Sequence, residues 1–188
     1  RDDATKNRDN ANFEPQVIAQ VFSAGIDWYA CDTIYEIETV RRILPDARFI
    51  FMHPIKPAAA IEQAYHKFRV RAFVIDHPEE LEKVRQHAGS DCTILVRIAG
   101  PPGALQSEGY RYGCAVDQAA WLAREVVTAG YKLGLCFHLG SQVMDPEMYD
   151  EAFLLVREVM YRARFMLDMV CVGGGFPKKR ISTSCAAK

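Results

Sequence analysis

The sequence predicts an α/β fold in which about six βα units repeat along the chain and build a parallel sheet. Apolar runs typical of buried strands alternate with segments in which apolar residues recur at helical spacing. The strands recur at intervals of roughly 20 to 35 residues, which leaves room for one crossover helix each. Such a sheet is either doubly wound or curled into a TIM-type (β/α)8 barrel. A barrel mouth is favoured because the strand ends carry polar residues or glycine, namely Asp32, His53, Asp76, Arg97, His138 and Gly173.

The first half of the chain contains three helical segments, each followed by a strand. Pro15 suits the first turn of the first helix, and Gly25 suits its end. Pro45 and Pro54 are expected to end the second helix and the strand after it, because proline lacks the backbone N–H that both structures use. The expected elements are helices 15–24, 34–43 and 57–68 and strands 26–31, 48–53 and 70–75.

The second half continues the alternation. Leu81 and Val84 share one side of an otherwise charged segment, which is typical of an amphipathic helix on the outside of a sheet. Residues 99–113 contain Pro101-Pro102-Gly103 and form a loop of a length usually associated with function. The expected elements are helices 79–88, 116–129 and 146–163 and strands 93–98, 132–137 and 166–172.

The composition is that of one ordinary globular domain. The 188 residues are 49% hydrophobic and 25% charged, and the net charge is −1 with both signs interspersed. We therefore expect neither a nucleic-acid nor a membrane partner. No apolar run is long enough to span a bilayer, and the polar N-terminus lacks the apolar core of a secretory signal. The six cysteines lack metal-site spacing and are expected to be small buried hydrophobes, so we predict a cytoplasmic protein without a metal.

Two stretches carry the candidate site. Gly173, Gly174 and Gly175 directly follow the apolar run 166–172, so the backbone can adopt positive φ and approach a ligand closely. Exposed N–H groups in such a turn form an anion-binding concavity, which predicts a phosphate site at a barrel mouth. His138 and Ser141 follow the preceding strand. The alternatives are a flexible glycine turn, a core histidine with satisfied hydrogen bonds, and a serine that caps a helix.

These stretches resemble the fold-type III pyridoxal-phosphate-dependent amino-acid decarboxylases, the family of ornithine and lysine decarboxylases. Residues 137–141, Phe-His-Leu-Gly-Ser, followed by Asp145-Pro146, are similar to that family's F-H-V-G-S…D-P. Residues 172–177, Val-Gly-Gly-Gly-Phe-Pro, are similar to I-G-G-G-F-P, and His53-Pro-Ile-Lys56 resembles N-P-x-K. The likeness runs from about residue 12 to residue 177. It implies the alanine racemase-like N-terminal barrel domain of that family.

The resemblance also implies a cofactor, pyridoxal 5'-phosphate (PLP), and an amino-acid substrate. By this resemblance, Gly173, Gly174 and Gly175 bind the cofactor phosphate, Ser141 hydrogen-bonds to it, and His138 stacks on the pyridine ring. Glu36 and Arg97 are implied to line the pocket. Two alternatives remain open, since Arg97 could form an ion pair inside the barrel and Glu36 could be a solvated helix residue.

The family attaches PLP to a lysine in Y-A-x-K-x-N on the first strand, and two registers compete for it here. An almost gap-free register places Asn10 at the lysine position, and asparagine cannot bind the cofactor covalently. The other register reads Ala4-Thr5-Lys6 as A-x-K but needs an insertion of about five residues. Lys6 is therefore the candidate catalytic residue, with Asn10 as the alternative occupant of that position.

Other positions depart from the family pattern. Ala30 and Cys171 stand where aspartates are expected, and Arg69 replaces a turn glycine and would be strained at positive φ. No eighth strand and no C-terminal β domain can be recognised after residue 177. We therefore divide the chain into a polar segment 1–11, a PLP-binding barrel-like domain 12–177 and an unrelated basic tail 178–188.

A partial barrel leaves its two edge strands, residues 26–31 and 166–172, without a partner on one side, so we expect a homodimer or self-association. The predicted function is impaired decarboxylation of a basic amino acid of the ornithine or lysine type, as in polyamine biosynthesis. Two alternatives are kept. One is a catalytically dead binding protein similar to antizyme inhibitors, and the other is a single-domain protein that binds PLP without decarboxylating a substrate.

Overall fold

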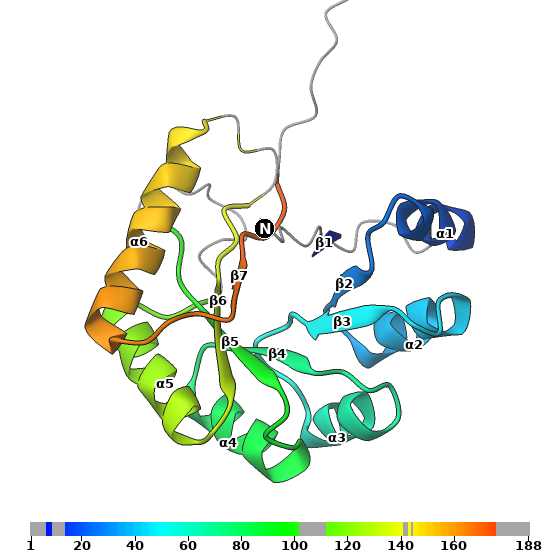
Figure 1. The fold of residues 1–188 in the computed structure, drawn as a ribbon, viewed down its shortest axis with the longest axis horizontal. Coiled ribbons are helices and arrows are strands. Elements are labelled where there is room, and N and C mark those ends of the chain that lie inside the picture. The colour runs from blue at the N-terminus through cyan, green and yellow to red at the C-terminus, as the bar shows by residue number, and fades with distance from the viewer. Residues whose placement is uncertain (1–6, 9–13, 102–111, 141–142, 144, 176–188) are drawn as a thin grey trace, which may run out of the picture.

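The computed structural model describes residues 7–8, 14–101, 112–140, 143 and 145–175. Within them, seven parallel strands follow one another in sequence order from β1 to β7. The sheet curls into an open half-barrel, and the helices lie along its convex side (Figure 1). The expected partial (β/α)8 architecture is confirmed. No helix in the described part of the chain has both the length and the apolar character needed to cross a membrane.

Every predicted helix and strand is present, with ends that differ by three residues or fewer from those expected. The elements are β1 (Asn7–Arg8), α1 (Pro15–Ser23), β2 (Trp28–Cys31), α2 (Ile34–Ile43), β3 (Arg48–Phe51), α3 (Ala58–His66), β4 (Ala72–Ile75), α4 (Pro78–His87), β5 (Thr93–Arg97), α5 (Val116–Thr128), β6 (Lys132–Cys136), α6 (Glu147–Ala163) and β7 (Met169–Cys171).

Strand β1 was not expected, and it corrects the prediction that residues 26–31 form an edge strand. Asn7 and Arg8 pair in parallel with Trp28 and Tyr29, so β1 covers the outer edge of β2. Two polar residues cannot produce an apolar strand signal, and only the pairing with β2 reveals this strand. The opposite edge of the described sheet is β7, as expected.

Side chains of the strands alternate between two apolar layers, which explains why the strands read as continuous apolar runs. The inner layer fills the concave side with Ala30, Ile50, Met52, Ala72, Val74, Leu95, Cys136 and Cys171. The outer layer packs against the helices and includes Phe49, Phe51, Phe73, Ile75, Ile94, Val96, Leu133 and Leu135. The inner layer is tightly packed, because a Cβ on Gly134 would lie 2.8 Å from Cγ of Leu95.

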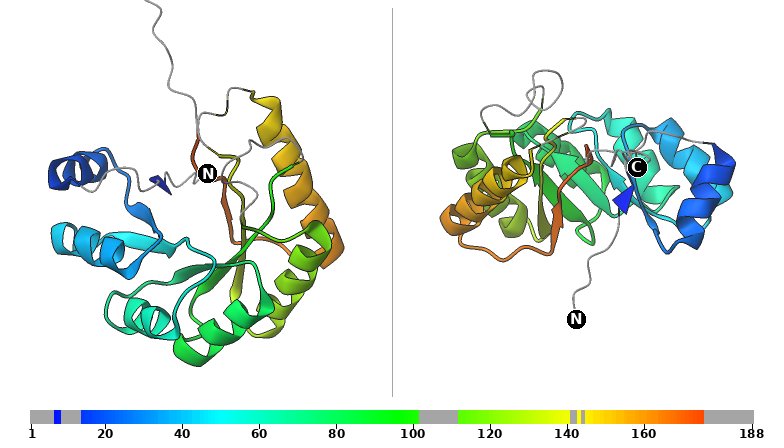
Figure 2. Two further views of the ribbon diagram at one scale, coloured as in Figure 1. Left: turned by 180° about the vertical axis from the view of Figure 1, so that it is seen from behind. Right: turned by 90° about the horizontal axis from the view of Figure 1, so that it is seen from above.

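Two further sequence expectations can be checked. Arg69 adopts a φ of 55°, so a non-glycine residue does occupy a left-handed position there. The five described cysteines, Cys31, Cys92, Cys114, Cys136 and Cys171, are all buried, as expected for small hydrophobes. The sixth, Cys185, lies outside the described residues. Figure 2 shows from behind and from above that the helices stay on the outside of the curled sheet.

Candidate functional site

The candidate site lies at the edge of the sheet where the parallel strands end. Because side chains alternate along a strand, the residue two positions beyond an inner-layer residue continues its row. Val74 is thus followed by Asp76, Leu95 by Arg97 and Cys136 by His138. The three polar side chains are half-buried and extend the rows that form the inner layer. We call this edge the mouth of the half-barrel.

The glycine loop, residues 173–175, packs directly against the segment that carries His138. Gly173 and Gly175 have φ values of 67° and 88°, which disfavour any side chain. A Cβ on Gly173 would lie 2.7 Å from the Phe137 carbonyl oxygen and 2.8 Å from His138 Nδ1, and one on Gly175 would collide with the Gly140 carbonyl. Glycine is therefore required here for the close approach of two backbones as well as for the turn.

Hydrogen bonds hold the glycine loop in place. The Gly174 N–H lies 3.4 Å from His138 Nδ1, which accepts it. The Gly175 carbonyl accepts the Val143 N–H at 2.8 Å, and the Gly174 carbonyl accepts the Tyr149 hydroxyl of α6 at 3.4 Å. Because two loop carbonyls are bound to the α6 side, the loop is a pre-shaped backbone surface rather than a loose turn. A pre-shaped glycine backbone of this kind suits a small anion.

Arg97 is the last residue of β5 and is paired in register with Cys136 of β6. Its guanidinium carbon lies 5.4 Å from the centre of the Tyr112 ring. No carboxylate in the described part of the chain forms an ion pair with it, so the expected alternative of a barrel-interior ion pair is not seen there. Burial raises the pKa of the neighbouring Cys136 thiol, which therefore stays protonated beside this cation.

Glu36 lies on α2 and serves the turn between β2 and α2. Its carboxylate accepts the N–H groups of Asp32 at 2.6 Å and Thr33 at 3.2 Å, while the Thr33 hydroxyl accepts the Glu36 N–H at 3.2 Å. This is a capping box, which satisfies the free N–H groups of a helix start. Burial raises the pKa of the Glu36 carboxyl against the opposing effect of these hydrogen bonds. Its suggested role in the pocket stays a prediction.

Two predicted site residues, Lys6 and Ser141, lie outside the described residues. Lys6 immediately precedes β1, whereas the site residues described above follow their strands. None of the four described lysines stands in the row of Asp76, Arg97 and His138. Lys132 begins β6 at the opposite end of the sheet, Lys67 follows the end of α3, and Lys83 lies on α4. The amine of Lys56 is buried behind the sheet, 5.9 Å from the Phe51 ring of the outer layer.

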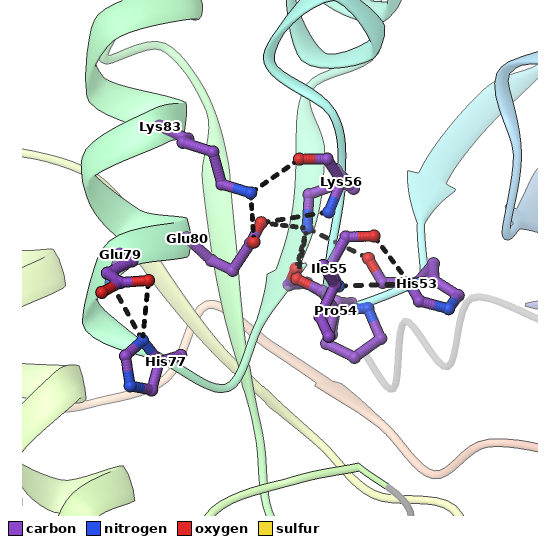
Figure 3. A network of polar contacts seen from close by, with 9 residues as sticks. His53, Pro54, Ile55, Lys56, His77, Glu79, Glu80 and Lys83 are labelled. Atoms are coloured by element: carbon purple, nitrogen blue, oxygen red, sulfur yellow. Dashed lines mark hydrogen bonds and ion pairs between the residues drawn. The ribbon is translucent and has the colours of Figure 1, made fainter.

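Lys56 belongs to a buried ionic network whose role the sequence did not show. Its side chain is fully buried, and its amine lies 3.7 Å from the carboxylate of Glu80, which is 6% exposed (Figure 3). Lys83 forms an ion pair with the same carboxylate. Burial is the main reason that the pKa of Lys56 falls to about 8. The match to N-P-x-K singled out Lys56, but only the fold brings it to Glu80, 24 positions away.

Comparison with known proteins settles the family. The family model for the pyridoxal-binding domain of pyridoxal-dependent decarboxylases matches residues 9–186. The chain belongs to this family. The lysine/ornithine decarboxylase of Selenomonas ruminantium is 31% identical over 174 residues, which make up 89% of this chain and 43% of that protein. Antizyme inhibitor 2 of Mus musculus is 27% identical over 154 residues, or 79% of this chain and 33% of that protein.

Solved structures agree with this assignment. Lysine decarboxylase from Selenomonas ruminantium superimposes with a TM-score of 0.80 at 26% identity, covering 93% of this chain and 47% of that one. An SrLDC variant in complex with PLP also gives 0.80, at 27% identity over 89% of this chain and 44% of that one. Alanine racemase from Acinetobacter baumannii, with 0.67 at 10% identity over 89% of this chain and 51% of that one, shares the fold alone. The chain spans less than half the length of these decarboxylases of Selenomonas ruminantium.

The mouth fits the phosphate end of the family's cofactor. Glycines at 173 and 175 leave a backbone-lined cradle that a Cβ could not enter, and the adjoining His138 ring is half-buried beside it. For covalent attachment, the described part of the chain offers near the mouth only Lys56 and Lys83. The buried Lys56 amine is already bound to Glu80 and to the carbonyls of His53, Pro54 and Val74, while the Lys83 amine is bound to Glu80 and the Lys56 carbonyl. The residues present therefore match the cofactor's phosphate more completely than they match its aldehyde.

Proposed function

We propose that this chain is the cofactor-binding part of a PLP-dependent decarboxylase that acts on a basic amino acid of the ornithine or lysine type. The observation that carries the proposal is the glycine loop, held against the His138 segment by Gly174 N–H and shaped for an anion. The family match supports PLP as that anion. The buried cysteines among the described residues support a reducing location, which we take to be the cytoplasm.

The residues at the mouth divide the work of binding. The glycine loop, Gly173, Gly174 and Gly175, would hold the phosphate, with the Gly174 amide exchanging its long 3.4 Å bond to His138 Nδ1 for a phosphate oxygen. Ser141 would be a further hydrogen-bond partner, and His138 would lie against the pyridine ring. Arg97 adds a positive charge beside the ring, and Glu36 orders the rim where β2 ends. When bound, PLP withdraws electrons from the substrate's α-carbon and so stabilises the charge left when carbon dioxide departs.

A glycine-to-alanine exchange at the cradle tests this proposal. Gly175→Ala should weaken PLP binding by about tenfold or more, because the new methyl group must displace the Gly140 backbone. Gly130→Ala is the matched control, since Gly130 also has positive φ, 85°, but a Cβ there meets nothing within 4 Å. PLP affinity is measured by quenching of tryptophan fluorescence. Equal affinities in the two variants would refute the cradle.

The proposed attachment point is Lys6, and borohydride reduction tests it separately. Reducing the purified protein with PLP and mapping the modified peptide should label Lys6 specifically if it is the catalytic lysine. Lys67, which is exposed after the end of α3, reports nonspecific labelling. Labelling of Lys6 no stronger than that of Lys67 would remove the catalytic role and leave Asn10 at the lysine position.

A second function has its own support, a catalytically inactive protein similar to antizyme inhibitors. No described lysine stands in the row of polar residues at the mouth, and antizyme inhibitor 2 is among the relatives. Carbon dioxide release from ornithine or lysine would support the decarboxylase. PLP binding without carbon dioxide release would support a cofactor-binding protein, and the absence of both would support the inactive relative.

A further inference from the structure

A second cluster at the mouth lies beside Arg97 and is not used by the proposed function. The Tyr112 ring lies under the Arg97 guanidinium and also meets the His53 ring, with centroids 5.1 Å apart in an edge-on contact. His53 follows β3 and Tyr112 precedes α5, so the two rings join segments far apart in sequence. Both rings are half-buried. We call His53 and Tyr112 the aromatic wall.

Backbone contacts fix the Tyr112 end of this wall. Cys114 bridges to Ile98 at the end of β5, and its N–H donates to the Arg97 carbonyl at 3.0 Å. The Gly113 N–H donates to the Asp76 carboxylate at 2.9 Å. Gly113 adopts a φ of 103°, and a Cβ there would lie 2.7 Å from Ala99 N. Tyr112 is therefore held close to Arg97 by the chain that follows it.

The His53 end has no comparable strand pairing and depends on Lys56. The Lys56 amine donates to the carbonyls of His53 at 3.0 Å, Pro54 at 2.9 Å and Val74 at 2.5 Å. Its three protons thus tie the loop after β3 to the end of β4. His53 Nδ1 also lies 2.7 Å from the Ile55 carbonyl, which closes the loop on itself (Figure 3).

The Glu80 carboxylate offsets the free-energy cost of burying the Lys56 amine. A buried amine without a counter-charge would be strongly destabilising, and the Glu80 carboxylate both pairs with the amine and accepts the Lys56 backbone N–H at 3.2 Å. Lys83 completes the network from the solvent side by donating to the Lys56 carbonyl at 2.7 Å. The first two turns of α4 are thereby attached to the loop that carries His53.

We propose that Lys56, paired with Glu80, is a positioning residue that holds the aromatic wall against Arg97 at the mouth. Lys56 acts through His53 and does not touch a ligand. The consequence for cofactor binding rests on the proposed function, whereas the position of His53 does not. The two parts can therefore be measured separately.

The position of His53 is measured by NMR of the histidine ring protons, assigned with His53→Gln. Removing the neighbouring ring in Tyr112→Leu should shift the His53 signal, because an aromatic ring at 5.1 Å changes the local field. Lys56→Met should produce a similar shift although it does not touch Tyr112. Lys67→Met is the control, an exposed lysine that follows α3; it should leave the His53 signal in place, because its amine pairs with Glu38 and belongs to no contact of Lys56, Glu80 or His53. Glu80→Gln, similar in size, replaces Lys56→Met if that variant does not fold.

Cofactor affinity gives the second measurement. Lys56→Met should weaken PLP binding by about tenfold, as the loss of supporting residues behind a binding group commonly does, and Lys67→Met by less than about twofold. The double variant Lys56→Met/Tyr112→Leu should bind PLP no more weakly than whichever of the two single variants binds PLP more weakly. The reason is that both substitutions act through the same aromatic wall.

If the His53 signal does not shift in folded Lys56→Met or Glu80→Gln, the positioning role of Lys56 is overturned, whether or not the PLP affinity changes. Additive effects of Lys56→Met and Tyr112→Leu on affinity would also overturn it. If the wild-type chain does not bind PLP at all, the proposed function fails while the NMR result still decides the role of Lys56.

Discussion

At the scale of single residues, the fold contains buried groups that cannot ionise freely. Burial raises the pKa of Cys92 and of Cys114 to about 12, and burial lowers that of Lys56 to about 8. These shifts have opposite consequences for stability. A thiol with a raised pKa keeps its proton in the folded state while the unfolded thiol, at 9.0, loses it, so stability falls as the pH rises above about 9. The Lys56 amine keeps its proton up to about pH 10.5 in the unfolded chain but only up to about pH 8 in the folded one. Its contribution to the free energy of unfolding therefore rises between pH 8 and 10.5.

The thiols predict a loss of stability in alkali that can be assigned to one residue. Each such thiol should lower the free energy of unfolding by up to about 1.4 kcal/mol per pH unit above pH 9. Cys92→Ala removes one thiol at a site where Cys92 is fully buried. Urea unfolding at pH 7, 9 and 10 should show a smaller loss in the variant than in the wild type. Parallel losses in both would show that Cys92 does not titrate as described.

At the scale of the elements, the capping box of α2 separates two roles for Glu36. Thr33→Ala should destabilise the protein by about 1 kcal/mol, because it removes the acceptor for the Glu36 N–H. Glu36→Gln keeps a side-chain oxygen that can accept hydrogen bonds but removes the charge. Unfolding and PLP titrations are measured for both variants.

If Glu36→Gln keeps wild-type PLP affinity, then Glu36 acts as a capping residue and has no role in the pocket. A loss of affinity in Glu36→Gln larger than that in Thr33→Ala would instead support the pocket role that the family resemblance implied. The comparison is informative because both variants disturb the same turn between β2 and α2.

The elements also show what the sequence could and could not predict. Helices and strands were predicted to within three residues because buried parallel strands and amphipathic helices have distinct apolar periods. The contact between His138 and the glycine loop followed from both segments ending neighbouring strands. Strand β1 was missed because it has only two residues, both polar. The Lys56 network was missed because its partners lie on separate elements and are joined only by the fold.

At the scale of the whole molecule, the described sheet remains open at β7. Strand β7 pairs with β6 on one side only, and Val170 in its middle is 41% exposed. An open, apolar edge strand favours pairing with another chain. We expect the protein to associate as its concentration rises, as proposed from the sequence.

A charge on the edge should reduce this association. Val170→Lys places a positive charge on β7 without removing any pairing with β6, because it keeps the backbone. Sedimentation velocity over a range of concentrations should show a smaller associated fraction in Val170→Lys than in the wild type. Tyr161→Lys on α6, where Tyr161 is 79% exposed, is the control for added surface charge. An equal reduction in both variants would place the association elsewhere.

The central claim is that PLP binds at the glycine loop and His138, and calorimetric titration of the wild-type chain with PLP tests it most directly. The account predicts saturable binding of one PLP per chain, with an apparent affinity that falls when inorganic phosphate is added, because phosphate competes for the amides of Gly173, Gly174 and Gly175. Binding that does not saturate, or that inorganic phosphate leaves unchanged, would contradict it.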